Sequence, residues 1–178
     1  LEVKPGSALA RNGAVVDEDF TEQAYRTIVE RLEAMGYGWY ETANFSRPGH
    51  ECHHSLAYWS AADYLGVGIG AVSTVGAQRW RNAAALAGYI TAARRGDHPR
   101  RTRELLNDDT RRRERWMLAL RLNRPLSLDW AGAPDHPESI DHLVNLGLVN
   151  ITDSTLVLSR EGRFVQNAVL CELMEYTA

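Results

Sequence analysis

Residues 17–45, DEDFTEQAYRTIVERLEAMGYGWYETANF, join a helix pattern directly to a strand pattern. Either Asp17 or Asp19 suits the N-cap of the helix, apolar residues then recur at helical spacing, and Gly36 is typical of a helix end. The aromatic-rich residues after Gly36 favour a strand. Since Leu1–Val3 also has a strand-like sequence, the order strand, helix, strand predicts a parallel βαβ unit and an α/β fold.

Residues 64–73 carry a glycine at every second position from Gly66 to Gly70. The pattern predicts a strand with one bare face, which a ligand or another backbone can approach closely. The segment Gly66–Ala71 also matches the spacing of a dinucleotide-binding fingerprint, with Ala71 in place of the third glycine. That motif requires an acidic residue about 20 positions later, and residues 72–96 contain none. A glycine-lined strand beside a cavity or a tightly packed neighbour is therefore the better prediction.

After Gly76 the sequence changes to helix patterns and becomes rich in arginine. This change predicts a domain boundary near residue 80 and two units, residues 1–80 and 81–178. The basic run Arg111–Arg115 suits a solvated or ion-paired helix turn, with a polyanion site as the alternative. The expected elements of the second unit are helices over 83–95, 108–124 and 137–146, a short link over 100–106, a hairpin over 148–158 and a final helix capped by Ser159.

The final helix, hairpin and helix suggest a winged-helix-like module, a kind that often binds DNA. The helix that would enter the groove instead carries Glu138, Asp141 and His142, and the hairpin turn carries Asp153. Phosphate binding requires lysine or arginine at these places. We therefore predict a packing or partner module and no nucleic acid as a partner.

The composition indicates an ordinary globular chain. Its 178 residues are 44% hydrophobic and 24% charged, and the net charge is −3, so nothing attracts polyanions to the chain as a whole. The longest apolar run, Leu65–Val72, is too short to span a bilayer, and the N-terminus does not resemble a signal peptide. Two cysteines cannot form a disulfide framework, which predicts a reducing, cytoplasmic location.

Residues 44–64 contain three histidines, one cysteine and four aromatic residues, the last of which is Tyr64. A helix beginning near His50 would place His50, His54 and Tyr58 on one face, where an imidazole can ligate a metal or a porphyrin iron. Adjacent histidines do not follow the spacing of a closed zinc site. Catalysis by Cys52 with His54 as base lacks an orienting third group. Hydrogen-bonded interior positions for His54 and Tyr58 are the remaining alternative.

Several linked motifs resemble the C-terminal half of the HemW family, the haem chaperones related to oxygen-independent coproporphyrinogen III oxidases. The resemblance implies that residues 1–80 are the last strands and helices of a radical-SAM partial barrel, followed by a mainly helical, winged-helix-like domain. The matching motifs are Val3–Ser7, Tyr40–Phe45, His50–Trp59, Asp63–Gly68 and Glu114–Leu122.

The resemblance implies a haem site at His54-Ser55-Leu56-Ala57-Tyr58-Trp59, which stands where the family has His-Asn-x-x-Tyr-Trp. His54 would ligate the haem iron, and Tyr58 and Trp59 would shape the pocket. The sequence departs from the family at two places. Ser55 replaces the asparagine, and Val72 stands where many relatives carry histidine.

A radical-SAM protein also holds a [4Fe–4S] cluster and S-adenosylmethionine through the motif Cys-x-x-x-Cys-x-x-Cys, which this chain lacks. We therefore expect cluster and S-adenosylmethionine only in a missing N-terminal part, and a fragment that is inactive alone. The partners implied are haem or a related tetrapyrrole and a haem-recipient protein.

Two alternative functions remain open at this stage. In the first, the chain is part of a coproporphyrinogen oxidase of porphyrin biosynthesis, whose substrate carboxylates bind Arg47 and Arg79. In the second, it is a structural or interaction module without tetrapyrrole binding. An open barrel edge at Leu1 would further predict a homodimer.

Overall fold

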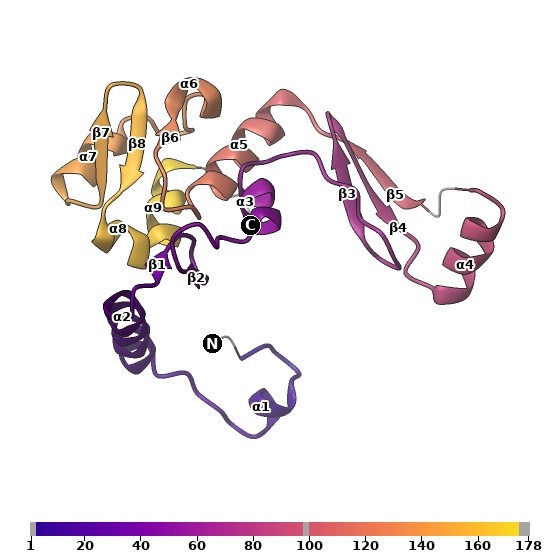
Figure 1. The fold of residues 1–178 in the computed structure, drawn as a ribbon, viewed down its shortest axis with the longest axis horizontal. Helices are drawn as coiled ribbons and strands as arrows, with labels where there is room; N and C mark the ends of the chain where they lie inside the picture. Colours follow the sequence, from indigo (N-terminus) through magenta and orange to yellow (C-terminus); the bar gives the residue numbers. More distant parts are fainter. Residues whose placement is uncertain (1–2, 98–99, 175–178) are drawn as a thin grey trace. The chain divides into compact units, whose positions relative to one another are not determined.

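The computed structural model describes residues 3–97 and 100–174 (Figure 1). The chain forms two compact units, residues 1–51 and residues 52–178. The predicted division at residue 80 stays a prediction, although a strand runs through that position. The elements of the first unit are α1 (Ala8–Arg11), α2 (Glu18–Ala34), β1 (Gly38–Trp39) and β2 (Phe45–Ser46).

Helix α2 confirms the helix prediction at both of its ends. Asp17 is the N-cap, and its Oδ1 accepts a hydrogen bond from the backbone N–H of Phe20 at 2.9 Å. Gly36 follows the helix with a φ of +82°, a backbone conformation that glycine adopts without steric cost. Local capping chemistry therefore sets the length of this helix.

The segment after α2 differs from the prediction, because residues 37–45 do not form one strand. β1 pairs antiparallel with β2, and the chain between them turns back on itself. The buried Trp39 fixes this hairpin: its indole Nε1 donates to the Thr42 carbonyl at 3.1 Å, and its ring packs edge-on against Tyr25 and is stacked with Phe45. The predicted parallel βαβ unit is thus wrong for this segment. The partner expected at Leu1–Val3 falls largely outside the described residues, and Val3 is not in a strand.

The second unit begins with α3 and an antiparallel sheet in the order β3-β4-β5. Its elements up to α5 are α3 (His53–Trp59), β3 (Val72–Val75), β4 (Gln78–Asn82), α4 (Leu86–Arg94), β5 (Arg100–Leu105) and α5 (Asp108–Ala119). β5 replaces the link predicted over 100–106, since this segment pairs along β4. Figure 1 shows α4 in the connection from β4 to β5.

The glycine-rich segment, residues 65–71, is a loop, and of the strand predicted over 64–73 only Val72 and Ser73 lie in β3. The amide of the buried Asn82 donates to the carbonyls of Gly66 and Gly68 at 3.0 and 2.9 Å, and Gly68 has a φ of +108°. The expected close approach of another backbone is found at Gly66. A Cβ there would lie 2.2 Å from the carbonyl oxygen of Val72, so only glycine fits without a shift.

The C-terminal part confirms the predicted order of helix, hairpin and helix. Its elements are β6 (Leu126–Ser127), α6 (Leu128–Ala131), α7 (Ser139–Asn145), β7 (Val149–Thr152), β8 (Thr155–Leu158), α8 (Arg160–Phe164) and α9 (Gln166–Leu173), with strand order β6-β8-β7. Ser159 is the predicted cap, since its Oγ accepts from the N–H of Gly162 at 3.0 Å, but the single final helix that was predicted is divided at Val165 into α8 and α9. The winged-helix and barrel assignments stay predictions, while the mixed α/β class is confirmed.

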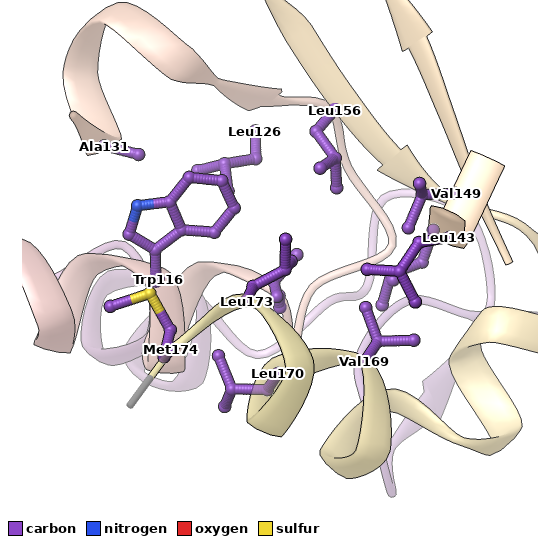
Figure 2. Close-up of a cluster of buried hydrophobic side chains, with 12 residues drawn as sticks. Trp116, Leu126, Ala131, Leu143, Val149, Leu156, Val169, Leu170, Leu173 and Met174 are labelled. Atoms are coloured by element: carbon purple, nitrogen blue, oxygen red, sulfur yellow. The ribbon is translucent and has the colours of Figure 1, made fainter. Parts of the chain in front are cut away.

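A core of apolar side chains holds these C-terminal elements on α5 (Figure 2). Trp116 from α5 is fully buried, and its Nε1 donates to the Gly132 carbonyl at 3.0 Å. Around it Figure 2 shows side chains from β6, α7, β7, β8 and α9, among them Leu126, Leu143 and Leu173. α5 is therefore anchored firmly to this core along one face.

Two arginines of the run on α5, Arg112 and Arg113, are ion-paired, in line with the first of the two alternatives predicted. Arg112 donates to Asp109 at 2.6 Å and also to Asp135, and Arg113 donates to Asp109 at 3.0 Å. The Arg112 hydrogen bond holds the pKa of Asp109 below its usual range. Across the described ranges, we find no helix with the length and apolar character that crossing a membrane requires.

Candidate functional site

Helix α3 carries the predicted site residues at its start and at its end. It begins at His53, so His50 lies outside it and the predicted stack of three side chains is reduced to His54 and Tyr58. These two are four positions apart and therefore lie on the same side of the helix, one turn from each other. The short helix thus presents one imidazole and one phenol together.

His54 is solvent-exposed, and it has no hydrogen-bond or ion-pair partner among the described residues. An imidazole without a partner keeps both nitrogens available for a ligand or a metal. Hydrogen-bonded interior positions had been one alternative for His54 and Tyr58, and the exposure of His54 argues against it. Ser55, next in the helix, is only partly exposed.

Tyr58 borders a pocket of about 310 Å³ between α3, β3, β4 and α5. Its ring lies 5.3 Å from that of Tyr64, between centroids. Partial burial, followed by the charge and hydrogen bond of Tyr64, raises the pKa of Tyr58, so its hydroxyl stays protonated near neutral pH. The lining residues are Tyr58, Ala61, Ala62, Tyr64, Val72, Thr74, Arg79, Glu114, Met117 and Leu118. The sequence departure at Val72 therefore falls inside this pocket.

A bidentate ion pair closes one wall of the Tyr58 pocket. Arg79 on β4 donates from Nη1 and Nη2 to the two carboxylate oxygens of Glu114 on α5, at 2.6 and 2.7 Å. The Nε of Arg79 donates to the Thr74 hydroxyl at 3.2 Å. The hydrogen bond to Glu114 raises the pKa of Arg79. Because Glu114 occupies the planar fork of Arg79, this arginine is not open to a substrate carboxylate as the oxidase alternative requires.

Trp59 points to a different side of α3, about 140° around the helix from His54. The guanidinium of Arg121, just after α5, lies over its ring at 5.2 Å from the centroid. The Tyr58 ring meets it edge-on at 5.3 Å. Trp59 also lines a second pocket, of about 340 Å³, whose other residues are Ser60, Ala119, Leu122, Arg124, Pro125, Leu126, Ser127 and Trp130. Trp59 therefore connects α3 to α5 and does not share a face with His54.

The other residues considered from the sequence do not join this site. Arg47 lies over the Tyr37 ring at 5.6 Å inside the first unit. Cys52 and Cys171 are both exposed, and neither is in a disulfide. No group of three or more His, Cys, Asp or Glu side chains able to hold a metal ion occurs within residues 3–97 and 100–174. A haem iron differs from such a centre because the porphyrin supplies most of its ligands and one histidine suffices.

Several side-chain positions and contacts around α3 were not found by sequence reasoning. Glu114 and Arg79 are 35 positions apart, and Trp130 and Arg124 lie beyond α5. The sequence had offered Arg79 only as a ligand of substrate carboxylates and Glu114 only as the first residue of a matching motif, so nothing indicated that they pair. Trp130 and Arg124 belong to no motif with a local spacing. Tyr64 also had a signal, since it stands in the Asp63–Gly68 segment that resembles the family.

Comparison with curated proteins finds relatives that align with nearly the whole chain. The chain is 34% identical over 98% of its length to a Mycobacterium tuberculosis protein named "Heme chaperone HemW", and it covers 46% of that protein. It is 27% identical over 83% of its length to the Bacillus subtilis protein of the same name and covers 41% of it. The chain therefore spans less than half the length of these relatives.

Comparison with solved structures finds a protein with a similar fold. The structure matches coproporphyrinogen III oxidase (HemN) from Escherichia coli, described as a radical SAM enzyme, with a TM-score of 0.65 over 85% of this chain and 40% of that one. The sequence identity is 17%, so this likeness shows the fold alone. A scan of protein-family models finds none that matches.

Proposed function

We propose that this chain binds haem and passes it to a recipient protein, on the basis of its 34% identity, over 98% of its length, to a protein named as a haem chaperone. In this proposal haem is the cargo, His54 ligates its iron, and Tyr58 and Trp59 form the surroundings of the ring. The observation that carries the proposal is the exposed, unpartnered imidazole of His54 one helical turn before Tyr58.

The chemistry of the residues on α3 supports a site that binds and releases haem. A neutral imidazole nitrogen is a common axial ligand of haem iron, and an exposed position allows haem to enter and leave without unfolding. Tyr58 offers a protonated hydroxyl and an aromatic ring beside the ligand. Trp59, on another side of α3, also holds the helix against α5 through Arg121.

A [4Fe–4S] cluster that binds S-adenosylmethionine does not fit the residues present. Such a cluster needs three closely spaced thiolates, and this chain has only Cys52 and Cys171. We therefore derive no step through a cluster. Arg79, one of the two arginines that the oxidase alternative assigns to substrate carboxylates, is already paired with Glu114.

Haem titration of the chain tests the proposal. We expect the Soret band of haem to shift on binding to the wild-type chain, and His54→Ala to weaken binding at least tenfold. His53→Ala is the matched control, since His53 is also exposed but lies about 100° away around the same helix. Equal affinity and equal spectra for His54→Ala and the wild-type chain would show that His54 is not the ligand.

A further inference from the structure

The second pocket beside α3 differs in charge from the other pockets around α5. The wall of the Tyr58 pocket carries the neutral pair Arg79–Glu114. In contrast, the pocket behind Trp59 is lined by one arginine, Arg124, and by no acidic side chain. The unbalanced charge at this place suits an anionic ligand.

Arg124 is an exposed arginine in the loop between α5 and β6, and it has no hydrogen-bond or ion-pair partner among the described residues. A guanidinium in that position keeps its planar fork of donors for a carboxylate. The hydroxyls of Ser60 and Ser127 also line the pocket and can add hydrogen bonds. Ser127 Oγ already accepts from the backbone N–H of Trp130 at 3.3 Å, which leaves its own O–H to donate.

The remaining walls are aromatic or apolar. Trp59 and Trp130 contribute two indoles, and Leu122 and Leu126 are both almost fully buried beneath the pocket. Each indole has a guanidinium over its ring, Arg121 at 5.2 Å and Arg115 at 5.7 Å. Flat rings stack favourably on such surfaces, and the nearby positive charges favour an anion.

We propose that the pocket formed by Trp59, Trp130 and Arg124 binds the carboxylate-bearing edge of a flat, apolar ring system. Its volume of about 340 Å³ lies near the lower end for ligand pockets, so it can enclose one edge of a tetrapyrrole or the whole of a smaller aromatic acid. The inference rests on the proposed function for its choice of probe, a porphyrin. It assigns to Arg124 the recognition of the acid group, separately from iron ligation at His54.

Metal-free protoporphyrin IX is the probe that separates this pocket from the iron site, because it has no iron for a histidine to ligate. Binding is measured with the full chain by quenching of tryptophan fluorescence. We expect Arg124→Gln to weaken binding about tenfold or more, the loss for a charge-assisted contact. Arg124→Lys should recover part of the affinity. Arg94→Gln, the same change on the exposed face of α4, is the matched control and should leave binding within twofold.

The dimethyl ester of protoporphyrin IX provides a second arm, since it keeps the ring and loses both acid groups. We expect it to bind the wild-type chain as weakly as the free acid binds Arg124→Gln. Equal binding of acid and ester, or equal binding by Arg124→Gln and the wild-type chain, would overturn the inference. Neither result would bear on iron ligation, which haem titration of His54→Ala tests on its own. Conversely, an Arg124-dependent binding of the metal-free acid would stand even if His54 proved not to be the haem ligand.

Discussion

Removal of the Glu114 carboxylate tests whether the ion pair with Arg79 holds the wall of the Tyr58 pocket. The pair has two short hydrogen bonds, at 2.6 and 2.7 Å, and its side chains are only 27% and 21% exposed. Hydrogen bonds to charged groups are worth roughly 1.5–3 kcal/mol each when buried, and the residual exposure reduces this value. We therefore expect Glu114→Ala to lower the free energy of unfolding by about 2 kcal/mol.

Urea unfolding followed by tryptophan fluorescence measures this loss. For a slope of roughly 1–3 kcal/mol per molar urea, the midpoint should fall by about 1 M. Glu104→Ala is the matched control, because Glu104 reaches the same arginine only at 4.0 Å and is 59% exposed. We expect the control to change the free energy of unfolding by less than about 0.5 kcal/mol. A midpoint for Glu114→Ala equal to that of Glu104→Ala would refute the structural role of the pair.

Three further predictions concern a glycine pair, an acid-sensitive carboxylate and a tyrosine. Gly66→Ala should destabilise the chain by at least about 1 kcal/mol in urea unfolding, because the new Cβ would lie 2.2 Å from the Val72 carbonyl oxygen. In contrast, Gly88→Ala should stabilise the chain by about 0.5–1 kcal/mol, because its Cβ meets nothing within 4 Å and alanine favours the helix α4. The pKa of Asp109 is lower in the folded chain than in the unfolded chain, where it is about 3.9, so the ionised carboxylate stabilises the fold at pH values above about 3.9. This stabilisation is lost as the pH falls through the lower, folded pKa. Asp109→Asn should therefore flatten the acid side of a curve of stability against pH. Burial and the neighbouring Tyr64 raise the pKa of Tyr58, so Tyr58→Phe should remove absorbance change from the alkaline end of an ultraviolet titration.

The parts of the fold that sequence reasoning found are those decided by neighbouring residues. Helix α2 follows from the Asp17 cap and the glycine after it, and α8 follows from the Ser159 cap. The hairpin β7–β8 follows from alternating apolar residues around a turn at Asp153, whose φ is +51°. Each of these signals acts within a few positions, so one sequence is enough to find it.

Long-range side-chain contacts decide the parts that were missed. The aromatic segment after α2 forms a hairpin because the Thr42 carbonyl accepts from Trp39 and from Tyr25, a residue of the preceding helix. The glycine loop is held by Asn82, which lies 16 positions beyond Gly66. The charged strand β5 has little intrinsic preference for a strand and forms by pairing along β4.

The candidate site shows the same division. Helical spacing alone placed His54 and Tyr58 on one face, while Trp59 required the structure to show that it faces α5 and Arg121. The pair of Arg79 and Glu114 could not be predicted, because a strand and a helix bring together residues that no local pattern links.

Coordination of the haem iron by His54 is the central claim, and imidazole rescue tests it most directly. The visible spectrum of ferric haem bound to the wild-type chain should show histidine ligation, and His54→Ala should lose that signature. Added free imidazole should restore it in the variant by occupying the vacated axial position. A His54→Ala complex with the wild-type spectrum before imidazole is added would contradict the account.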